Sequence, residues 1–195
     1  MKDTESTISP ARLEAFSDGV LAIIITIMVL EIHSPEGHSL SDWKQSISLL
    51  LAYLFSFIMI AIYWNNHHHL LRATKNITAI VMWANMALLF FLSLIPVTTA
   101  WVGANENYKH SWPIALYATV CLFAGLSFYA LTLAILKADK TNIKIANLNK
   151  SYKGIVSPIL YILAICLAFI NPYVAIAIML STAALWFIPD KRLTN

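Results

Sequence analysis

The chain has 195 residues, of which 59% are hydrophobic and 12% are charged, with a net charge of +3. Soluble domains carry about 25% charged residues, so this composition excludes a soluble globular protein. It predicts an all-α polytopic membrane protein. The two cysteines, Cys121 and Cys166, lie inside apolar segments and are expected to pack as small hydrophobic side chains rather than to form a disulfide.

Six apolar segments follow one another, and no linker divides them into two domains. We therefore expect a single domain over residues 1–195. A cleavable signal peptide is excluded because acidic residues precede the first segment and no small-residue cleavage site follows it. Pro96 is expected to bend the third helix near its outer end. The predicted helices cover about residues 12–32, 44–63, 77–101, 112–136, 154–170 and 173–188.

Basic residues are distributed unevenly among the connections. Of the 13 Lys and Arg residues, all but Lys44 and Lys109 lie in the two termini and in the second–third and fourth–fifth connections. Connections rich in Lys and Arg remain in the cytoplasm. Both termini are therefore expected to be cytoplasmic, in agreement with an even number of spans.

The first helix, 12–32, differs from the others. Arg12, Glu14 and Asp18 lie within two turns of an uncharged run from Gly19 to Leu30. The whole helix would reach roughly 31 Å, about the thickness of a hydrocarbon core, whereas the uncharged run alone is too short. Ionisable groups at membrane depth need partners or water. We therefore expect this helix to lie in the interior of the assembly.

A polar cluster is predicted at the cytoplasmic end of the first helix. The second helix is expected to end near Tyr63, so that Trp64 and the run His67–His69 lie at the depth of Arg12 and Asp18. An Arg–Asp–His cluster beside Trp64 would fix the rotation of the first helix. The alternative is a snorkelling Arg12 and an Asp18 favoured by the helix dipole.

No motif for catalysis or for a bound cofactor is present. The chain has no GxSxG elbow, no HExxH motif, no phosphate-binding glycine loop and no CxxC pair. Consecutive residues of a helix point about 100° apart, so the three histidines are not expected to converge on one metal ion. The sequence thus predicts a protein that is not an enzyme and that holds no tightly bound metal.

One apolar stripe of the first helix contains a hydroxyl group. Ile23, Thr26, Ile27 and Leu30 follow the spacing i, i+3, i+4, i+7 and share one face. This pattern is consistent with ordinary helix packing. If copies of the helix surround an axis, Ile23 and Leu30 would instead form apolar rings with an oxygen ring at Thr26 between them, the parts of a gated ion pore. The pattern alone leaves both interpretations open.

The motif Arg12-x-x-x-Phe16-Ser17-Asp18-Gly19, followed by a short apolar helix, resembles the signature of the endosomal and lysosomal potassium channel family of the transmembrane protein 175 type. With one motif and six spans, the chain is similar to the single-repeat bacterial members. The resemblance implies a homotetrameric potassium channel without a P-loop filter in the bacterial inner membrane. Its partners would be K⁺ and the lipid bilayer, with no cofactor and no nucleic acid.

The same resemblance implies roles for individual residues. In the family the first helix lines the pore, with an Ile/Leu constriction and a threonine layer that contacts the permeant ion; the matching positions are Ile23, Thr26 and Leu30. At position 22 this chain has Ala where some relatives have Ser. Either His67 or His68 matches a histidine that holds the helices together. The polar motif residues are matched by Arg12, Ser17 and Asp18.

A proton-coupled secondary transporter is the main alternative, with Asp18 and His67–His69 as a proton relay. It is disfavoured because the six spans contain no internal repeat and no discontinuous helix near the middle of the membrane.

Overall fold

The structure is a computed structural model that describes residues 9–34, 39, 43–44, 46–105, 108–139, 145–146 and 152–187. The described chain folds as an all-α bundle. Its helices are α1 (Pro10–Leu30), α2 (Ile47–Arg72), α3 (Ala79–Ser93), α4 (Ile95–Gly103), α5 (Ser111–Ala138), α7 (Lys153–Ala168) and α8 (Pro172–Phe187).

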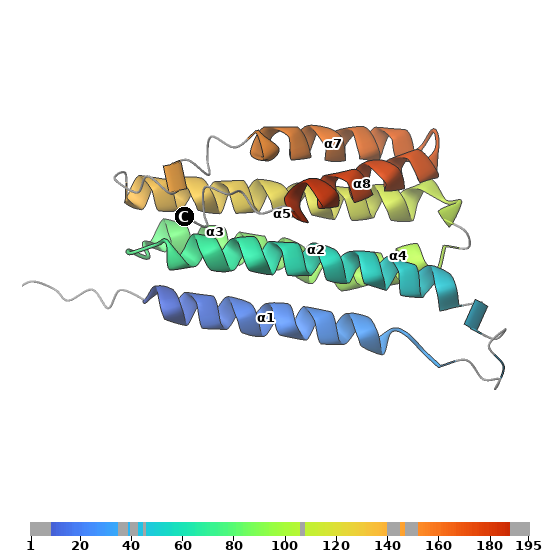
Figure 1. Cartoon of the computed structure of the whole chain (residues 1–195), viewed down its shortest axis with the longest axis horizontal. Helices are drawn as coiled ribbons and strands as arrows, with labels where there is room; N and C mark the ends of the chain where they lie inside the picture. The colour runs from blue at the N-terminus through green and yellow to red at the C-terminus, as the bar shows by residue number, and fades with distance from the viewer. Residues whose placement is uncertain are drawn as a thin grey trace, which may run out of the picture.

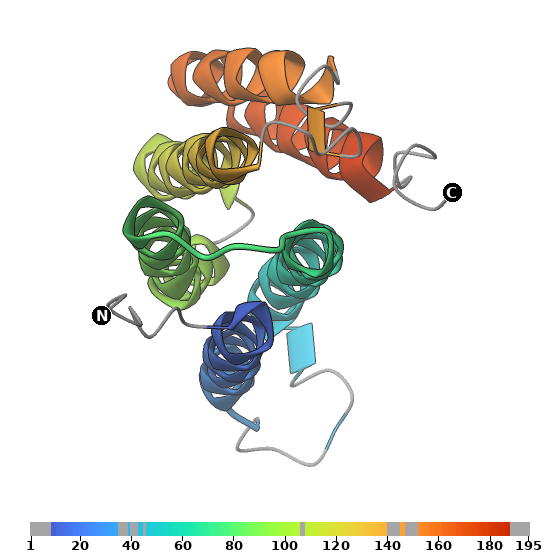
Figure 2. The ribbon, with the colours of Figure 1, turned by 90° about the vertical axis from the view of Figure 1, so that its left-hand side faces the viewer.

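The helices run side by side along the long axis of the molecule, with α1 at one edge of the bundle and α7 and α8 at the opposite edge (Figures 1 and 2). The start of α1 lies at the same end as the last turns of α2 and α5, while the α7–α8 connection lies at the other end (Figure 1). The described helix ends at the start of α1 and at the ends of α2 and α5, which flank segments predicted to be cytoplasmic, therefore share one end of the bundle.

Helix α5 forms the centre of the core. It packs against α3, α4, α7 and α8, and fourteen of its residues are buried. Helix α1, by contrast, packs against α2, α3 and α4 along one face only. A helix with a single covered face at the edge of the bundle has its other face available for further contacts.

Four helical segments in the described residues are long and apolar enough to cross a membrane: α1, α2, α3 together with α4, and α5. Helices α7 and α8 have 16 residues each. At 1.5 Å per residue each reaches about 24 Å, which is less than the roughly 30 Å of a hydrocarbon core. These two helices form a hairpin, in which the Asn171 side chain accepts a hydrogen bond from the Tyr173 amide at 3.0 Å and so caps α8.

The end of the second helix differs from the sequence-based expectation, whereas the third segment is interrupted near Pro96, where a bend was expected. Helix α2 continues to Arg72, nine residues beyond Tyr63, so the histidines at 67–69 are helical rather than part of an exit loop. The third segment divides at Leu94, two residues before Pro96, into α3 and α4. Proline lacks an amide hydrogen and cannot complete the helical bonding pattern, which accounts for the break.

Candidate pore helix and its polar contacts

Helix α1 has one buried face and one exposed face. The buried face repeats at helical spacing and packs against the rest of the bundle; it consists of Leu13, Ser17, Leu21, Ile24 and Met28. The exposed face contains the stripe predicted from the sequence. In the single chain Ile23 is 58% exposed, Leu30 is 75% exposed, and Ile27 and Thr26 are also exposed.

The exposed stripe continues towards the N-terminus of α1. Phe16 is 54% exposed, and Gly19, one turn later, is exposed on the same side. A Cβ built on Gly19 would meet nothing within 4 Å, so packing inside one chain does not require a glycine there. Residues 16 to 30 thus present a continuous, mostly apolar surface along three to four turns of helix.

Thr26 is the hydroxyl-bearing residue of this surface. Its Oγ1 donates a hydrogen bond to the carbonyl oxygen of Ile23, at 2.8 Å. Because the hydroxyl hydrogen is directed back to the helix, the oxygen lone pairs remain available on the outer side. This geometry is suited to an oxygen ligand for a cation.

The buried face carries a chain of hydrogen bonds that joins three helices. Ser17 of α1 donates through Oγ to the Leu13 carbonyl at 2.8 Å and accepts from Asn85 Nδ2 of α3 at 3.0 Å. Asn85 Oδ1 lies 2.7 Å from His67 Nε2 of α2. Since the amide oxygen only accepts, His67 donates through Nε2–H. Its Nδ1 atom is buried and has no partner in the described residues.

Two further contacts fix the polar end of α1. The Trp64 indole Nε1 of α2 donates to Asp18 Oδ1 at 3.0 Å. One turn later on α2, His68 Nδ1 lies 2.6 Å from Glu14 Oε1. This contact is an ion pair when His68 is protonated and a hydrogen bond when it is neutral. The Trp64 and His68 rings are stacked with centroids 5.7 Å apart, which makes these contacts one cluster.

The single Arg–Asp–His cluster predicted from the sequence takes a different form in the structure. Arg12 is exposed and makes no ion pair with the acidic residues that the structure describes. Asp18 pairs with Trp64, while His67 and His68 contact different helices. The three histidines occupy successive positions of a helix and therefore point in different directions. The described part of the chain contains no group of three His, Cys, Asp or Glu residues placed to hold a metal.

Sequence reasoning missed two participants in these contacts. Asn85 is completely buried between His67 and Ser17, and its signal was an amide within the uncharged third segment. Glu14 was noted as part of a polar helix end, but its partner His68 was not identified. In both cases the residue type indicated a polar contact between helices, and only the tertiary structure identified the partner.

The outer half of α1 meets a second group of hydroxyls. Ser56 Oγ lies 2.7 Å from Thr99 Oγ1 and 2.9 Å from the Tyr117 hydroxyl, which joins α2, α4 and α5. From this group Thr99 Oγ1 reaches Met28 of α1 at 3.8 Å through the sulfur atom. Sulfur is a weak acceptor, so this contact holds α1 less firmly than those around Asn85.

Comparison with known proteins identifies close relatives among channels. Residues 12–96 match the family model described as endosomal/lysosomal potassium channel TMEM175. A Chryseobacterium protein named as a potassium channel is 43% identical over 183 residues, which cover 93% of this chain and 94% of the relative. The rat endosomal/lysosomal proton channel TMEM175 is 31% identical over 102 residues, or 50% of this chain and 20% of that protein.

The three-dimensional fold is also similar to a solved structure. The crystal structure of a lysosomal potassium-selective channel TMEM175 homolog from Chamaesiphon minutus superposes with a TM-score of 0.80 at 27% sequence identity. The match covers 91% of this chain and 95% of that one. Sequence and fold therefore agree over almost the whole chain.

Proposed function

This chain belongs to the endosomal/lysosomal potassium channel TMEM175 family, and we propose that it is a potassium-selective cation channel that conducts K⁺ passively through a pore lined by α1. It is an integral membrane protein. The proposal draws on bacterial relatives that are named potassium channels and match most of the chain. Proton permeation, which the name of the rat relative suggests, would be a variant of the same function.

The observation that carries the proposal is the contrast between the two faces of α1. One face is held by hydrogen bonds to α2 and α3, while the other leaves Ile23, Thr26 and Leu30 exposed in the single chain. A helix with buried polar contacts on one face and a threonine on the other is suited to line an axis shared by several copies. A face that simply contacted lipid would gain nothing from Thr26.

We infer an assembly of four copies, each with six membrane-spanning helices and both termini in the cytoplasm. Four segments are long enough to span, and α7 and α8 form a shorter apolar hairpin beside α5. The bacterial inner membrane is the expected location. The tetramer follows from the family resemblance rather than from a feature of the chain.

Selectivity is assigned to Thr26. Four hydroxyl oxygens in one layer would replace part of the hydration shell of K⁺, as the oxygen rings of other cation channels do. Each hydroxyl hydrogen is already bonded to the Ile23 carbonyl. The oxygens would therefore face the pore without rearrangement, and the channel would require no resident cofactor.

The gate is assigned to the apolar residues on both sides of this layer. Rings of Ile23 and Leu30 would narrow the pore, and a narrow apolar constriction closes to ions by losing its water. Leu30 is the more exposed of the two in the single chain. We assign the outer constriction to Leu30 and the inner one to Ile23, with Ile27 contributing to the wall between them.

The geometry gives less support to a proton-coupled transporter. A relay through Asp18 requires a neighbour that can both accept and donate a proton, but the bonded partner of Asp18 is the Trp64 indole, which only donates. His67 is bonded to an amide, which cannot pass a proton on either. Asp18 and His67 are thus occupied by contacts that cannot pass a proton on, whereas His68 contacts the Glu14 carboxylate, which leaves that pair as the remaining site for proton exchange.

The function is tested by the reversal potential of the purified protein in planar bilayers, with K⁺ on one side and Na⁺ on the other. A potassium-selective pore shifts the reversal potential towards the K⁺ equilibrium potential. Absence of current in folded, reconstituted protein, together with saturable substrate-coupled uptake, would replace the channel by a transporter.

A further inference from the structure

The hairpin of α7 and α8 is shorter than α5, the helix against which it packs, and two contacts show which part of α5 it covers. At one end, Phe169, the residue after α7, lies against Trp112 in the first turn of α5, with ring centroids 5.0 Å apart. At the other end, a Cβ built on Gly154 would lie 3.8 Å from the Tyr129 ring. From Trp112 to Tyr129 α5 rises about 26 Å. This distance agrees with the length of the two 16-residue helices.

The missing length lies at the end of the bundle where α1 begins. There α5 continues from Tyr129 to Ala138, about 14 Å farther, and Figure 1 shows it extending past the start of α7. The sequence allows the hairpin little extension at this end, because Lys150 stands just before α7 and Pro189 and Asp190 follow α8 closely. The apolar part of this edge is therefore about 5 Å shorter than a typical hydrocarbon core.

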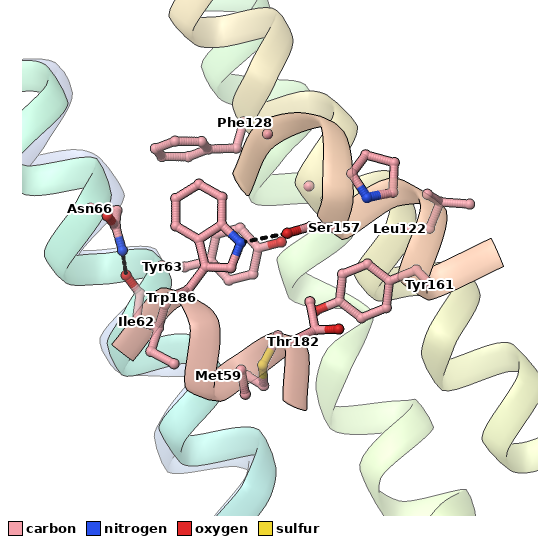
Figure 3. Close-up of a pocket in the computed structure, with 14 residues that line it drawn as sticks. Met59, Ile62, Tyr63, Asn66, Leu122, Phe128, Ser157, Tyr161, Thr182 and Trp186 are labelled. Carbon is pink, nitrogen blue, oxygen red and sulfur yellow. Dashed lines mark hydrogen bonds between the residues drawn. The ribbon is translucent and has the colours of Figure 1, made fainter. Parts of the chain in front are cut away.

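Both ends of the hairpin carry side chains that favour the interface between lipid headgroups and hydrocarbon. At the end where α1 begins, Trp186 of α8 donates from Nε1 to Ser157 Oγ of α7 at 2.7 Å (Figure 3). The Lys153 ammonium lies 5.9 Å from the centre of the Trp186 ring. At the opposite end Trp112 and Tyr173 are exposed. Since Trp, Tyr and Lys anchor helix ends at the interface, the two interfaces are separated at this edge by the length of the short hairpin.

The outer face of α7 is placed to contact lipid. Helices α7 and α8 lie at the edge of the bundle opposite α1 (Figures 1 and 2), so they point away from an axis that α1 lines. Helix α7 has no charged residue after Lys153. Its exposed side chains recur at helical spacing along its whole length and include Ile155, Ile159, Ile162 and, just after the helix, Ile170. This face therefore presents a continuous apolar surface to acyl chains.

We propose that the α7–α8 edge is a binding surface for phospholipids with short acyl chains, around which the bilayer is locally thinned to about 25 Å. The inference rests on the six-span topology proposed above. A bilayer thins around an apolar stretch that is too short for it, at a free-energy cost for each ångström of mismatch. Lipids with short chains fill the thinner layer and avoid that cost. The preference is local, because α5 and the α3–α4 segment reach about 38 Å or more.

The first test measures the depth of spin labels on Ile155→Cys, Ile162→Cys and Ile170→Cys in a Cys166→Ala background, in bilayers of dioleoyl phosphatidylcholine. The labels at 155 and 170 should both be accessible to a water-soluble nickel complex, from opposite sides of the membrane, while the label at 162 is accessible only to oxygen. A label at 155 or 170 that lies within the hydrocarbon would overturn the thinning alone. Labels at 155 and 170 on the same side would overturn it together with the six-span topology. Neither result depends on whether the protein conducts K⁺.

The second test measures which lipid surrounds the hairpin. A fluorophore is attached to Ile162→Cys, and in a matched control to Phe90→Cys on α3, where the side chain is also exposed in the single chain. The protein is reconstituted in an equal mixture of dimyristoleoyl and dioleoyl phosphatidylcholine, with one or the other lipid brominated so that it quenches on contact. Quenching should show about threefold enrichment of the short-chain lipid at position 162 and no enrichment at position 90. No enrichment at 162, or the same enrichment at both positions, would overturn the proposal.

Discussion

In the first half of α1, polar side chains make directional contacts with α2 and α3, whereas the second half is held by apolar packing and by one weak contact to the sulfur of Met28. Hydrogen bonds fix both the rotation and the height of a helix, while apolar packing tolerates small displacements. The first half therefore determines which face of α1 is turned away from the bundle. The second half carries the residues assigned to permeation.

The two faces of α1 also differ from each other along the length of the helix. Leu21 and Leu30 are identical residues on one helix, but Leu21 is buried in the bundle and Leu30 is 75% exposed in the single chain. Ile23 and Ile24 are adjacent in sequence, and only Ile24 is buried. Each pair is a matched comparison, because its two residues are of the same type and lie on the same helix. They differ only in the face of α1 on which they lie.

The largest expected effect concerns Leu21→Ala and Leu30→Ala. Leu21→Ala opens a cavity in the core and should cost about 2–5 kcal/mol of stability, which denaturant titration of the reconstituted protein measures. Leu30→Ala should leave the fold of the chain nearly unchanged and should raise single-channel conductance, because the apolar constriction widens. Equal stability losses in both variants, with unaltered conductance in Leu30→Ala, would remove the distinction between the two faces.

The next effect concerns Asn85→Leu. This change leaves the Ser17 hydroxyl and the His67 imidazole without their shared partner and should cost about 2 kcal/mol of stability. Ser93→Ala is the control on the same helix, because the Ser93 hydroxyl donates to the Phe90 carbonyl of α3 and to no other helix that the structure describes. If Asn85→Leu is as stable as Ser93→Ala, the hydrogen bonds between the helices do not hold α1.

A smaller effect is expected for Thr26→Val, which keeps the shape of the side chain and removes the oxygen. Loss of one oxygen ligand per subunit should reduce the K⁺/Na⁺ permeability ratio roughly fivefold. This value assumes that the four hydroxyls together contribute about 1 kcal/mol to the discrimination between K⁺ and Na⁺. Thr26→Ser should preserve the ratio. A permeability ratio that survives Thr26→Val would place the selectivity elsewhere in the pore.

The smallest effect is expected for Trp64→Phe, which removes the indole donor to Asp18. Trp64 is half-exposed, so water can replace the lost hydrogen bond and stability should fall by about 1 kcal/mol or less. Asp18→Asn retains an acceptor oxygen, so its loss of stability should be smaller still. The thermal unfolding midpoints of the two variants show which variant loses more stability. A larger loss of stability in Asp18→Asn would show that the carboxylate charge itself is required.

The sequence predicted much of the fold because hydrophobic periodicity and charge reflect the membrane directly. The all-α class and the apolar stripe of α1 followed from these patterns, and the channel family followed from the motif at residues 12–19. The end of α2 was not predicted correctly, because a run of polar residues such as Trp64 to His69 is typical of a loop. In the structure their partners on α1 and α3 keep them helical.

The polar contacts were predicted in kind but not in detail. The sequence indicated that Asp18 and the histidines need partners at the same depth, since buried polar groups are costly alone. It did not indicate that Asn85 would join Ser17 to His67, because that pairing depends on how α3 approaches α1. Arg12 was assigned to the cluster by its charge, whereas its position on the exposed side of α1 separates it from Asp18.

The central claim is that the exposed face of α1 lines the pore, and cysteine accessibility at Ile23 and Ile24 tests it most directly. The variants Ile23→Cys and Ile24→Cys are made in a Cys166→Ala background, because Cys166 is exposed whereas Cys121 is buried. Potassium current is then measured in bilayers during exposure to a charged thiol reagent. The account predicts block in Ile23→Cys and no block in Ile24→Cys. Block in Ile24→Cys with none in Ile23→Cys, or block in neither while current is present, would contradict it.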